Sequence, residues 1–219
     1  ASPPAPPHST STGLAGRAHE VTSLAVGMRA LPKHANTPCG DLAARFEPPE
    51  APRQASLLLI VDGLGHGTPA ALAAQEAERV ISLAPLASLD ILFARLDAAL
   101  QATRGAAVGL ARIHGARLSY AAIGNTRALR WRAGAHTRLP SQYGIVGDGR
   151  PKRLQTIELD LQVDDALVLF TDGLDESLHI DAIPPDWRRD PEHLCASLIA
   201  HWKNTDDDAA VLVALVRGE

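Results

Sequence analysis

Aromatic residues are scarce in this chain, at 4% of its 219 residues, and it has no long apolar run. Because no apolar stretch approaches the ~18 residues of a membrane-spanning helix, we expect no membrane association. The formal net charge of −4 argues against a surface that neutralises the phosphates of a nucleic acid, so we expect no nucleic-acid partner. Apolar residues still make up 46%, which predicts one sizeable core packed mainly with alanine, leucine, valine and isoleucine.

Cysteine is also sparse, and the two present, Cys39 and Cys195, lie far apart in the sequence. Neither belongs to a CxxC or cysteine–histidine spacing that would hold zinc, so we interpret both as free or buried thiols, with a disulfide as the open alternative. The chain begins with Ala1 and has no basic-then-apolar signal segment. We therefore expect a processed chain or an excised piece that works in the reducing cytoplasm.

The chain divides by composition into a short tail and one domain. Residues 1–13 hold four prolines and several small polar residues, which predicts a disordered tail or linker, and residues 14–219 form the folded domain. In that domain, hydrophobic periodicity predicts helices at about 68–83, 88–103 and 191–202. It predicts strands at about 19–28, 41–47, 56–61, 106–113, 116–123, 127–132, 154–161, 166–171 and 209–216. Consecutive strands favour antiparallel hairpins, and two sheets between helices would accommodate this order.

Aspartates recur where apolar runs stop. Asp62 follows residues 56–61, Asp172 follows residues 166–171, Asp41 opens a strand, and residues 206–208 are three aspartates before the last strand. Carboxylates at the rims of buried strands repel one another, and divalent cations with oxygen ligands relieve that repulsion. An Asp-Gly pair is also an ordinary turn, so the residues alone leave a metal site and a set of turns both open.

Six segments, in order, resemble SpoIIE-type phosphatases, which form the bacterial branch of the metal-dependent (PPM, type 2C) serine/threonine phosphatases. VDGLGHGTPAALAA (residues 61–74) resembles their first metal motif, and its Gly63-Leu64 version is most similar to RsbX-like members. The other five segments are CGD (39–41), AAIGNTRALRW (121–131), GIVG (144–147), DDALVLFTDGLDES (164–177) and DDAAVLV (207–213). Cys39, Asp165 and Ala210 depart from the usual motifs, but none of the three changes removes a ligand carboxylate.

This resemblance implies an α+β fold: a four-layer αββα sandwich of two mainly antiparallel sheets flanked by helices. It implies two Mn²⁺ or Mg²⁺ ions between the sheets at one end. The metal ligands that it implies are Asp41, Asp62, the carbonyl of Gly63, Asp172 and Asp207, with Asp62 bridging both ions and Asp41 supporting the site. Asp207 is preferred to Asp206 and Asp208 only for its spacing to Val211.

His66, in the glycine loop 63–67, is a catalytic candidate beside Asp62 and Asp172. Its functional interpretation is that it orients water or a ligand carboxylate, and the alternative is a packed histidine that shapes the loop.

The resemblance further implies hydrolysis of phosphoserine or phosphothreonine by a metal-bridging water, without a phosphoenzyme. The expected substrate is a phosphorylated regulatory protein in bacterial partner switching or stress signalling: a STAS-domain anti-sigma antagonist or a related scaffold. Two alternatives stay open. One is a catalytically inactive PPM-fold module that regulates a signalling partner, and the other is a metallohydrolase that acts on small phosphoesters.

Overall fold

The structure, a computed structural model, describes residues 21–47, 55–149 and 153–218. The predicted tail at residues 1–13 and the start of the first predicted strand lie outside these ranges.

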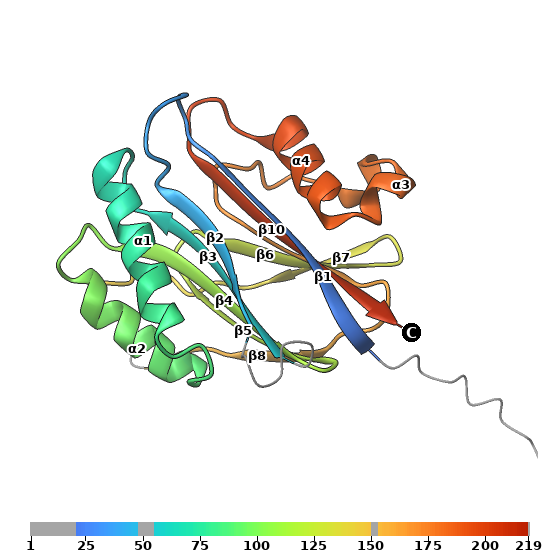
Figure 1. The fold of residues 1–219 in the computed structure, drawn as a ribbon, viewed down its shortest axis with the longest axis horizontal. Helices are drawn as coiled ribbons and strands as arrows, with labels where there is room; N and C mark the ends of the chain where they lie inside the picture. The colour runs from blue at the N-terminus through green and yellow to red at the C-terminus, as the bar shows by residue number, and fades with distance from the viewer. Residues whose placement is uncertain (1–20, 48–54, 150–152, 219) are drawn as a thin grey trace, which may run out of the picture.

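Two five-stranded antiparallel sheets form the centre of the molecule (Figure 1). The first sheet has the order β1-β10-β9-β6-β7, and the second has the order β2-β3-β4-β5-β8. The strands of the first sheet are β1 (Val21–Leu31), β10 (Ala209–Gly218), β9 (Ala166–Phe170), β6 (Arg127–Arg132) and β7 (Ala135–Leu139). Those of the second are β2 (Asp41–Phe46), β3 (Ala55–Gly63), β4 (Ala106–His114), β5 (Arg117–Ile123) and β8 (Ile157–Asp160). Every strand pair is antiparallel, as expected.

Helices cover the outer face of each sheet. Helices α1 (Thr68–Ser82) and α2 (Leu89–Leu100) lie over the second sheet, and α3 (Pro185–Arg188) and α4 (Pro191–Trp202) lie beside the first (Figure 1). A short 3₁₀ turn, Ile180–Ala182, precedes α3. The predicted four-layer αββα sandwich is therefore confirmed.

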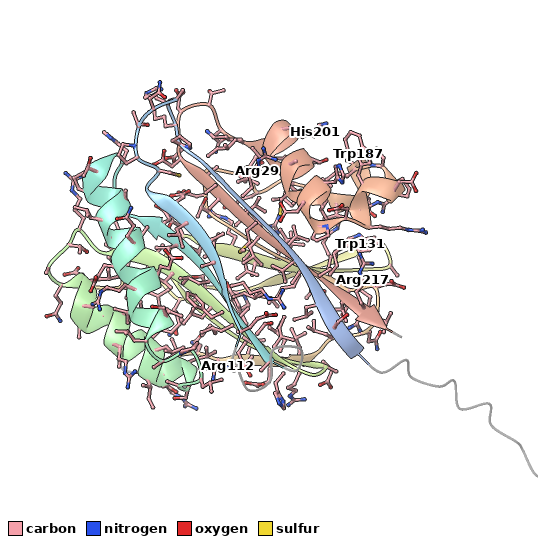
Figure 2. The ribbon with its side chains drawn as sticks, viewed as in Figure 1. Arg29, Arg112, Trp131, Trp187, His201 and Arg217 are labelled. Atoms are coloured by element: carbon pink, nitrogen blue, oxygen red, sulfur yellow. The ribbon has the colours of Figure 1, made fainter. Side chains whose placement is uncertain are left out.

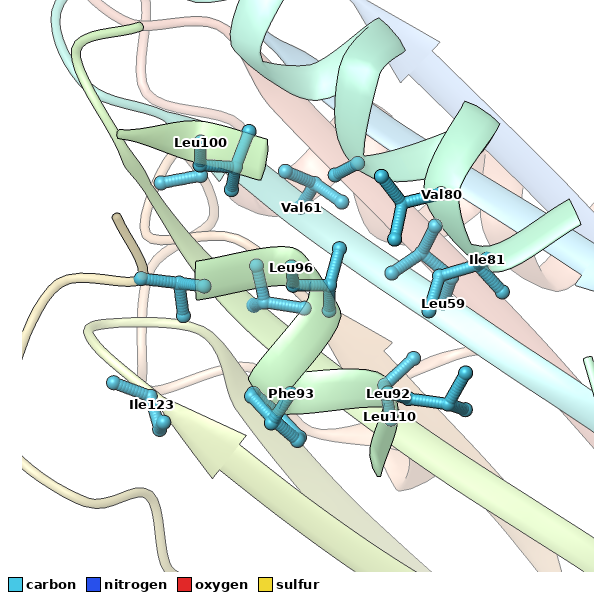
Figure 3. Packing of buried hydrophobic residues seen from close by; sticks show 14 of the residues in the cluster. Leu59, Val61, Val80, Ile81, Leu92, Phe93, Leu96, Leu100, Leu110 and Ile123 are labelled. Atoms are coloured by element: carbon cyan, nitrogen blue, oxygen red, sulfur yellow. The ribbon is translucent and has the colours of Figure 1, made fainter. Parts of the chain in front are cut away.

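The apolar strands are buried on both faces, which explains why their sequences do not alternate with polar residues. Along β3, Leu57, Leu59 and Val61 face the helices, where they pack with residues such as Val80 and Leu96 (Figure 3). The intervening residues of β3, Leu58 and Ile60, point into the core between the two sheets. Strand β10 alternates in the same way between the inter-sheet core and the core under α4. These two strands therefore hold the layers together.

Helix α2 begins where the sequence predicts, because the Ser88 hydroxyl accepts a hydrogen bond from the Ile91 amide at 3.4 Å. Strand β1 instead continues to Leu31, into residues predicted as a loop, because its ladder with β10 extends to the Leu31–Ala209 pair.

Two elements, β7 and α3, were not predicted from the sequence. Strand β7 is an exposed edge strand without an apolar run, and its turn from β6 is made by Ala133 and Gly134, both at positive φ. Helix α3 is four residues long and lies against β6 (Figure 2): the Arg188 guanidinium is 5.6 Å from the centre of the Trp131 ring. The Trp131 indole also donates to Asp181 at 3.1 Å, so long-range contacts hold this segment in place.

Both cysteines are free thiols, Cys195 buried and Cys39 half-buried, as the first interpretation expected. No helix in the described ranges combines the length and apolarity needed to cross a bilayer.

Candidate metal centre

Asp41 and Asp62 face each other across neighbouring strands. Asp41 is the first residue of β2, Asp62 lies near the end of β3, and the antiparallel register pairs the two directly. Side chains of directly paired residues have Cβ atoms roughly 5 Å apart. Asp41 is only 6% exposed, so one carboxyl of the pair is almost completely removed from solvent.

The other sheet brings Asp172 and Asp207 to the same end of the molecule. Strands β9 and β10 are antiparallel neighbours, with Phe170 paired to Val211, so the end of β9 meets the start of β10. Asp172 follows β9 by two residues and Asp207 precedes β10 by two. The two apolar strands that the sequence marks as ending at an aspartate therefore end at one shared site.

Electrostatic coupling indicates how closely these carboxyls gather. Burial and, next, the charge of Asp62 raise the pKa of Asp41 to about 8. Burial and then the charge of Asp172 raise the pKa of Asp62 to about 7. The pKa of Asp207 is also raised, by burial first and by the Asp172 charge second. Each of the four predicted ligand carboxylates thus lies within the field of at least one of the others, and the contacts link them from Asp41 through Asp62 to Asp172 and Asp207.

A divalent cation fits this arrangement. Oδ2 of Asp41 is buried and has no hydrogen-bond partner among the described residues, which is costly for a carboxylate oxygen. Clustered oxygen ligands of the same charge are the donor set that Mg²⁺ and Mn²⁺ prefer. Within the described ranges, however, no three acidic, histidine or cysteine side chains are already gathered as a complete ligand set.

Asn125 is part of the site, although the sequence suggested only a turn residue. Its amide donates to Oδ2 of Asp172 at 2.5 Å, from the connection between β5 and β6. Asn204 supports the same residue from the other side, donating from its side chain to the Asp172 carbonyl at 3.1 Å. The connection between β5 and β6 crosses from the second sheet to the first at the end of the molecule where the aspartates lie. This crossing is the signal that could have identified Asn125.

The three consecutive aspartates have different roles. Asp208 is 4% exposed, and its carboxylate accepts the backbone amides of Lys33 at 2.6 Å and Gly40 at 2.7 Å. It therefore ties the β1–β2 connection to β10. Asp206 is exposed, and Asp207 lies between these extremes, near Asp172. Asp207 is thus the member of the triplet best placed to be a ligand.

The glycines of the two Asp-Gly-Leu triplets are required by close backbone approach. A Cβ on Gly63 would lie 2.2 Å from the carbonyl oxygen of Ala70 in α1. A Cβ on Gly173 would lie 1.8 Å from the carbonyl oxygen of Asp208. Each glycine lets another segment pack directly beside its neighbouring aspartate, so the repeated motif is a structural requirement of the site.

His66 lies in the loop between Asp62 and α1. It is exposed, unlike the packed histidine of the alternative interpretation, and no hydrogen bond is recorded for it within the described residues. Its role in orienting water stays a prediction.

Comparisons with known proteins indicate the family and the fold of this chain. The family model of Stage II sporulation protein E (SpoIIE) matches residues 52–217. A chain from a study of the bacterial stressosome as a modular system adapted to control secondary messenger signalling shares 26% identity, with a TM-score of 0.77. That match covers 88% of this chain and 99% of the other. A search of curated protein sequences finds no match.

Two further solved structures share the fold at lower identity. RsbX in complex with magnesium is 19% identical, with a TM-score of 0.72 over 88% of this chain and 95% of that one. The Mycobacterium tuberculosis serine/threonine phosphatase PstP is 16% identical, with a TM-score of 0.68 over 89% of this chain and 99% of that one. Since the model of Stage II sporulation protein E covers most of the sequence, the chain belongs to the SpoIIE family.

Proposed function

We propose that the protein is a Mn²⁺- or Mg²⁺-dependent phosphatase that hydrolyses phosphoserine or phosphothreonine on a regulatory protein. The observation that carries this proposal is the convergence of four mutually repelling carboxylates from both sheets, one with a buried oxygen that lacks a partner. Membership of the SpoIIE family supports the reaction class, and magnesium in the RsbX structure supports the choice of a hard cation.

The proposed ligands are the residues that the family resemblance implies, and three observations support them. Asp62 lies between Asp41 and Asp172 in the chain of electrostatic contacts, which suits a carboxylate that bridges two ions. Asp172 and Asp207 would hold one ion from the first sheet, and the carbonyl of Gly63 would complete the second sheet's contribution. Asp41 would support the site from its buried side. Bound cations would supply an acidified water for in-line attack on phosphorus.

The remaining residues position this set. The hydrogen bond from Asn125 fixes the orientation of the Asp172 carboxylate. Asp208 holds the β1–β2 connection, and with it Gly40, beside Asp41. His66 would orient water from the rim of the loop.

We propose a partner-switching substrate, a phosphorylated STAS-domain antagonist of an anti-sigma factor or a related scaffold. Similarity to RsbX and to the stressosome chain supports this choice.

The test is hydrolysis of p-nitrophenyl phosphate and of a phosphoserine peptide with Mn²⁺ present. We expect the Asp62→Asn and Asp172→Asn variants to lose more than about 100-fold in kcat, because each removes a ligand charge. Asp206→Asn is the matched control, since it changes an exposed aspartate beside Asp207, and it should retain parental activity. Parental rates in Asp62→Asn and Asp172→Asn would show that the site is assigned wrongly. Calorimetric Mn²⁺ binding without hydrolysis of either substrate would favour the inactive regulatory module.

A further inference from the structure

A large groove lies directly beside the carboxylate cluster. Its volume is about 600 Å³, and its walls include Leu64, Asn125, Gln142, Tyr143, Gly144 and Ile145. Asn125 belongs to both sites, because it lines the groove and donates to Asp172. Leu64 follows the Asp62-Gly63 pair. A molecule whose phosphate reached the carboxylate cluster would therefore extend naturally into this groove.

An exposed aromatic side chain, that of Tyr143, lies at the rim of the groove. The side chain of Tyr143 is fully exposed, with a relative accessibility of 101%, in a chain whose aromatics make up only 4% of its residues. Leu64 and Ile145 are only half-buried and add apolar surface to the same wall. Exposed apolar surface lining a concave site, with an aromatic residue at its edge, is typical of binding sites.

The segment that carries Tyr143 is held firmly at both ends. Gln142 exchanges backbone hydrogen bonds of 2.9 Å with Ala122 and Gly124. Val146 exchanges bonds of 2.9 and 3.0 Å with Ala106, and the Gly147 amide donates to Asp97 of α2 at 2.8 Å. Between these two attachment points, the backbone amides of residues 143–145 donate no hydrogen bond within the described residues. The rim is thus preorganised and has donors available for another main chain.

Charge indicates what the groove would accept. Asp148 is the one charged residue among the described residues that line it, and Asn125 links the groove to Asp172 of the carboxylate cluster. A lining with one negative charge and no positive charge favours a neutral or basic segment over an acidic one.

We propose that the groove binds the polypeptide next to the phosphorylated residue of a protein substrate, and seats one apolar side chain of that polypeptide against Leu64, Tyr143 and Ile145. This inference rests on the proposed function and deepens it. Because Asn125 both lines the groove and bonds to Asp172, the seated side chain lies within a few positions of the phosphoserine, at about 3.3 Å per extended residue. The groove thereby distinguishes a protein substrate from a small phosphoester, which cannot fill it.

The experiment uses phosphoserine peptides that each carry one leucine, within three positions of the phosphoserine, in a background of glycine, serine and lysine. We expect the parent protein, with Mn²⁺, to prefer the best leucine peptide over the leucine-free peptide by about tenfold in kcat/KM. Tyr143→Ala should reduce this preference to less than about threefold, mainly through KM, because it removes the exposed aromatic surface at the rim of the groove. Tyr143→Phe should keep the preference. Leu86→Ala, which shortens an exposed apolar side chain that does not line the groove, is the matched control and should also keep it.

A binding measurement separates failure of the groove from failure of the proposed function. In EDTA, fluorescence polarisation follows the unphosphorylated leucine peptide and its leucine-free counterpart. If the protein binds the leucine peptide more tightly than the leucine-free peptide, loses this preference in Tyr143→Ala and hydrolyses neither substrate, peptide binding in the groove is supported and the phosphatase activity is refuted. Hydrolysis of p-nitrophenyl phosphate without any leucine preference, or with a preference that survives Tyr143→Ala, would overturn the groove and leave the phosphatase standing.

Discussion

Replacing Asp41 by asparagine should stabilise the metal-free protein at alkaline pH. The pKa of this carboxyl is raised from its ordinary value of 3.8 to about 8, by burial first and by the Asp62 charge second. Between these two values the folded protein holds a proton that the unfolded chain has released. The free energy of unfolding therefore falls as the pH rises from about 4 to about 8, and the loss is complete above the folded pKa.

The magnitude follows from the difference between the two pKa values. Each pKa unit corresponds to about 1.4 kcal/mol, so an isolated carboxyl with this difference would cost up to about 6 kcal/mol at pH 9. Because Asp62 causes part of the shift and itself titrates at about 7, we assign on the order of 2–3 kcal/mol to Asp41 alone. For a chain of this length that corresponds to a rise in Tm of roughly 4–10 °C.

The assay is urea unfolding followed by circular dichroism in EDTA, at pH 5 and pH 9. Asp41→Asn should match the parent closely at pH 5 and exceed it at pH 9, and its stability should depend less on pH. Asp206→Asn, at an exposed position, should follow the parent at both values. If Asp41→Asn were destabilised equally at pH 5 and pH 9, the carboxyl would not be the buried, repelled group described above.

Other predictions follow from the same site. Saturating Mn²⁺ should raise the Tm of the parent at pH 8, because cations neutralise the repelling carboxylates, and Asp172→Asn should gain markedly less in the same thermal scan. Asn125→Ala should lower kcat on p-nitrophenyl phosphate by about 10–100-fold with little change in Tm, because it frees the Asp172 carboxylate without opening a core; an unchanged kcat would contradict the positioning role. Asp208→Ala should lower the free energy of unfolding by about 2–4 kcal/mol in urea titrations, because the Lys33 and Gly40 amides lose their acceptor. A loss below 0.5 kcal/mol would contradict the tie between β1–β2 and β10.

Much of the fold can be predicted from local patterns in the sequence. The continuous apolar runs of β3, β9 and β10 can be stable only as strands buried on both faces, and that requires layers on either side. The hydroxyl of Ser88 and the periodicity of residues 89–100 are enough to place α2. The family resemblance pointed to Asp41, Asp62, Asp172 and Asp207, and the strand ladders bring these four to one end of the sandwich.

Local patterns could not assign roles that depend on contacts between distant segments. Asp207 and Asp208 are indistinguishable as neighbours in a sequence, and only the approach of residues 33 and 40 buries one and leaves the other near Asp172. Asn125 reads as a turn residue until β9 places Asp172 within hydrogen-bonding distance. The rim around Tyr143 has no helical or strand periodicity, so its position depends on bonds to β4, β5 and α2. The sequence by itself therefore determined most of the strands, their burial on both faces and the acidic residue types, because burial and periodicity act over a few residues. The tertiary structure alone decided which carboxylates face one another, because that depends on how the two sheets and their connections are registered in space.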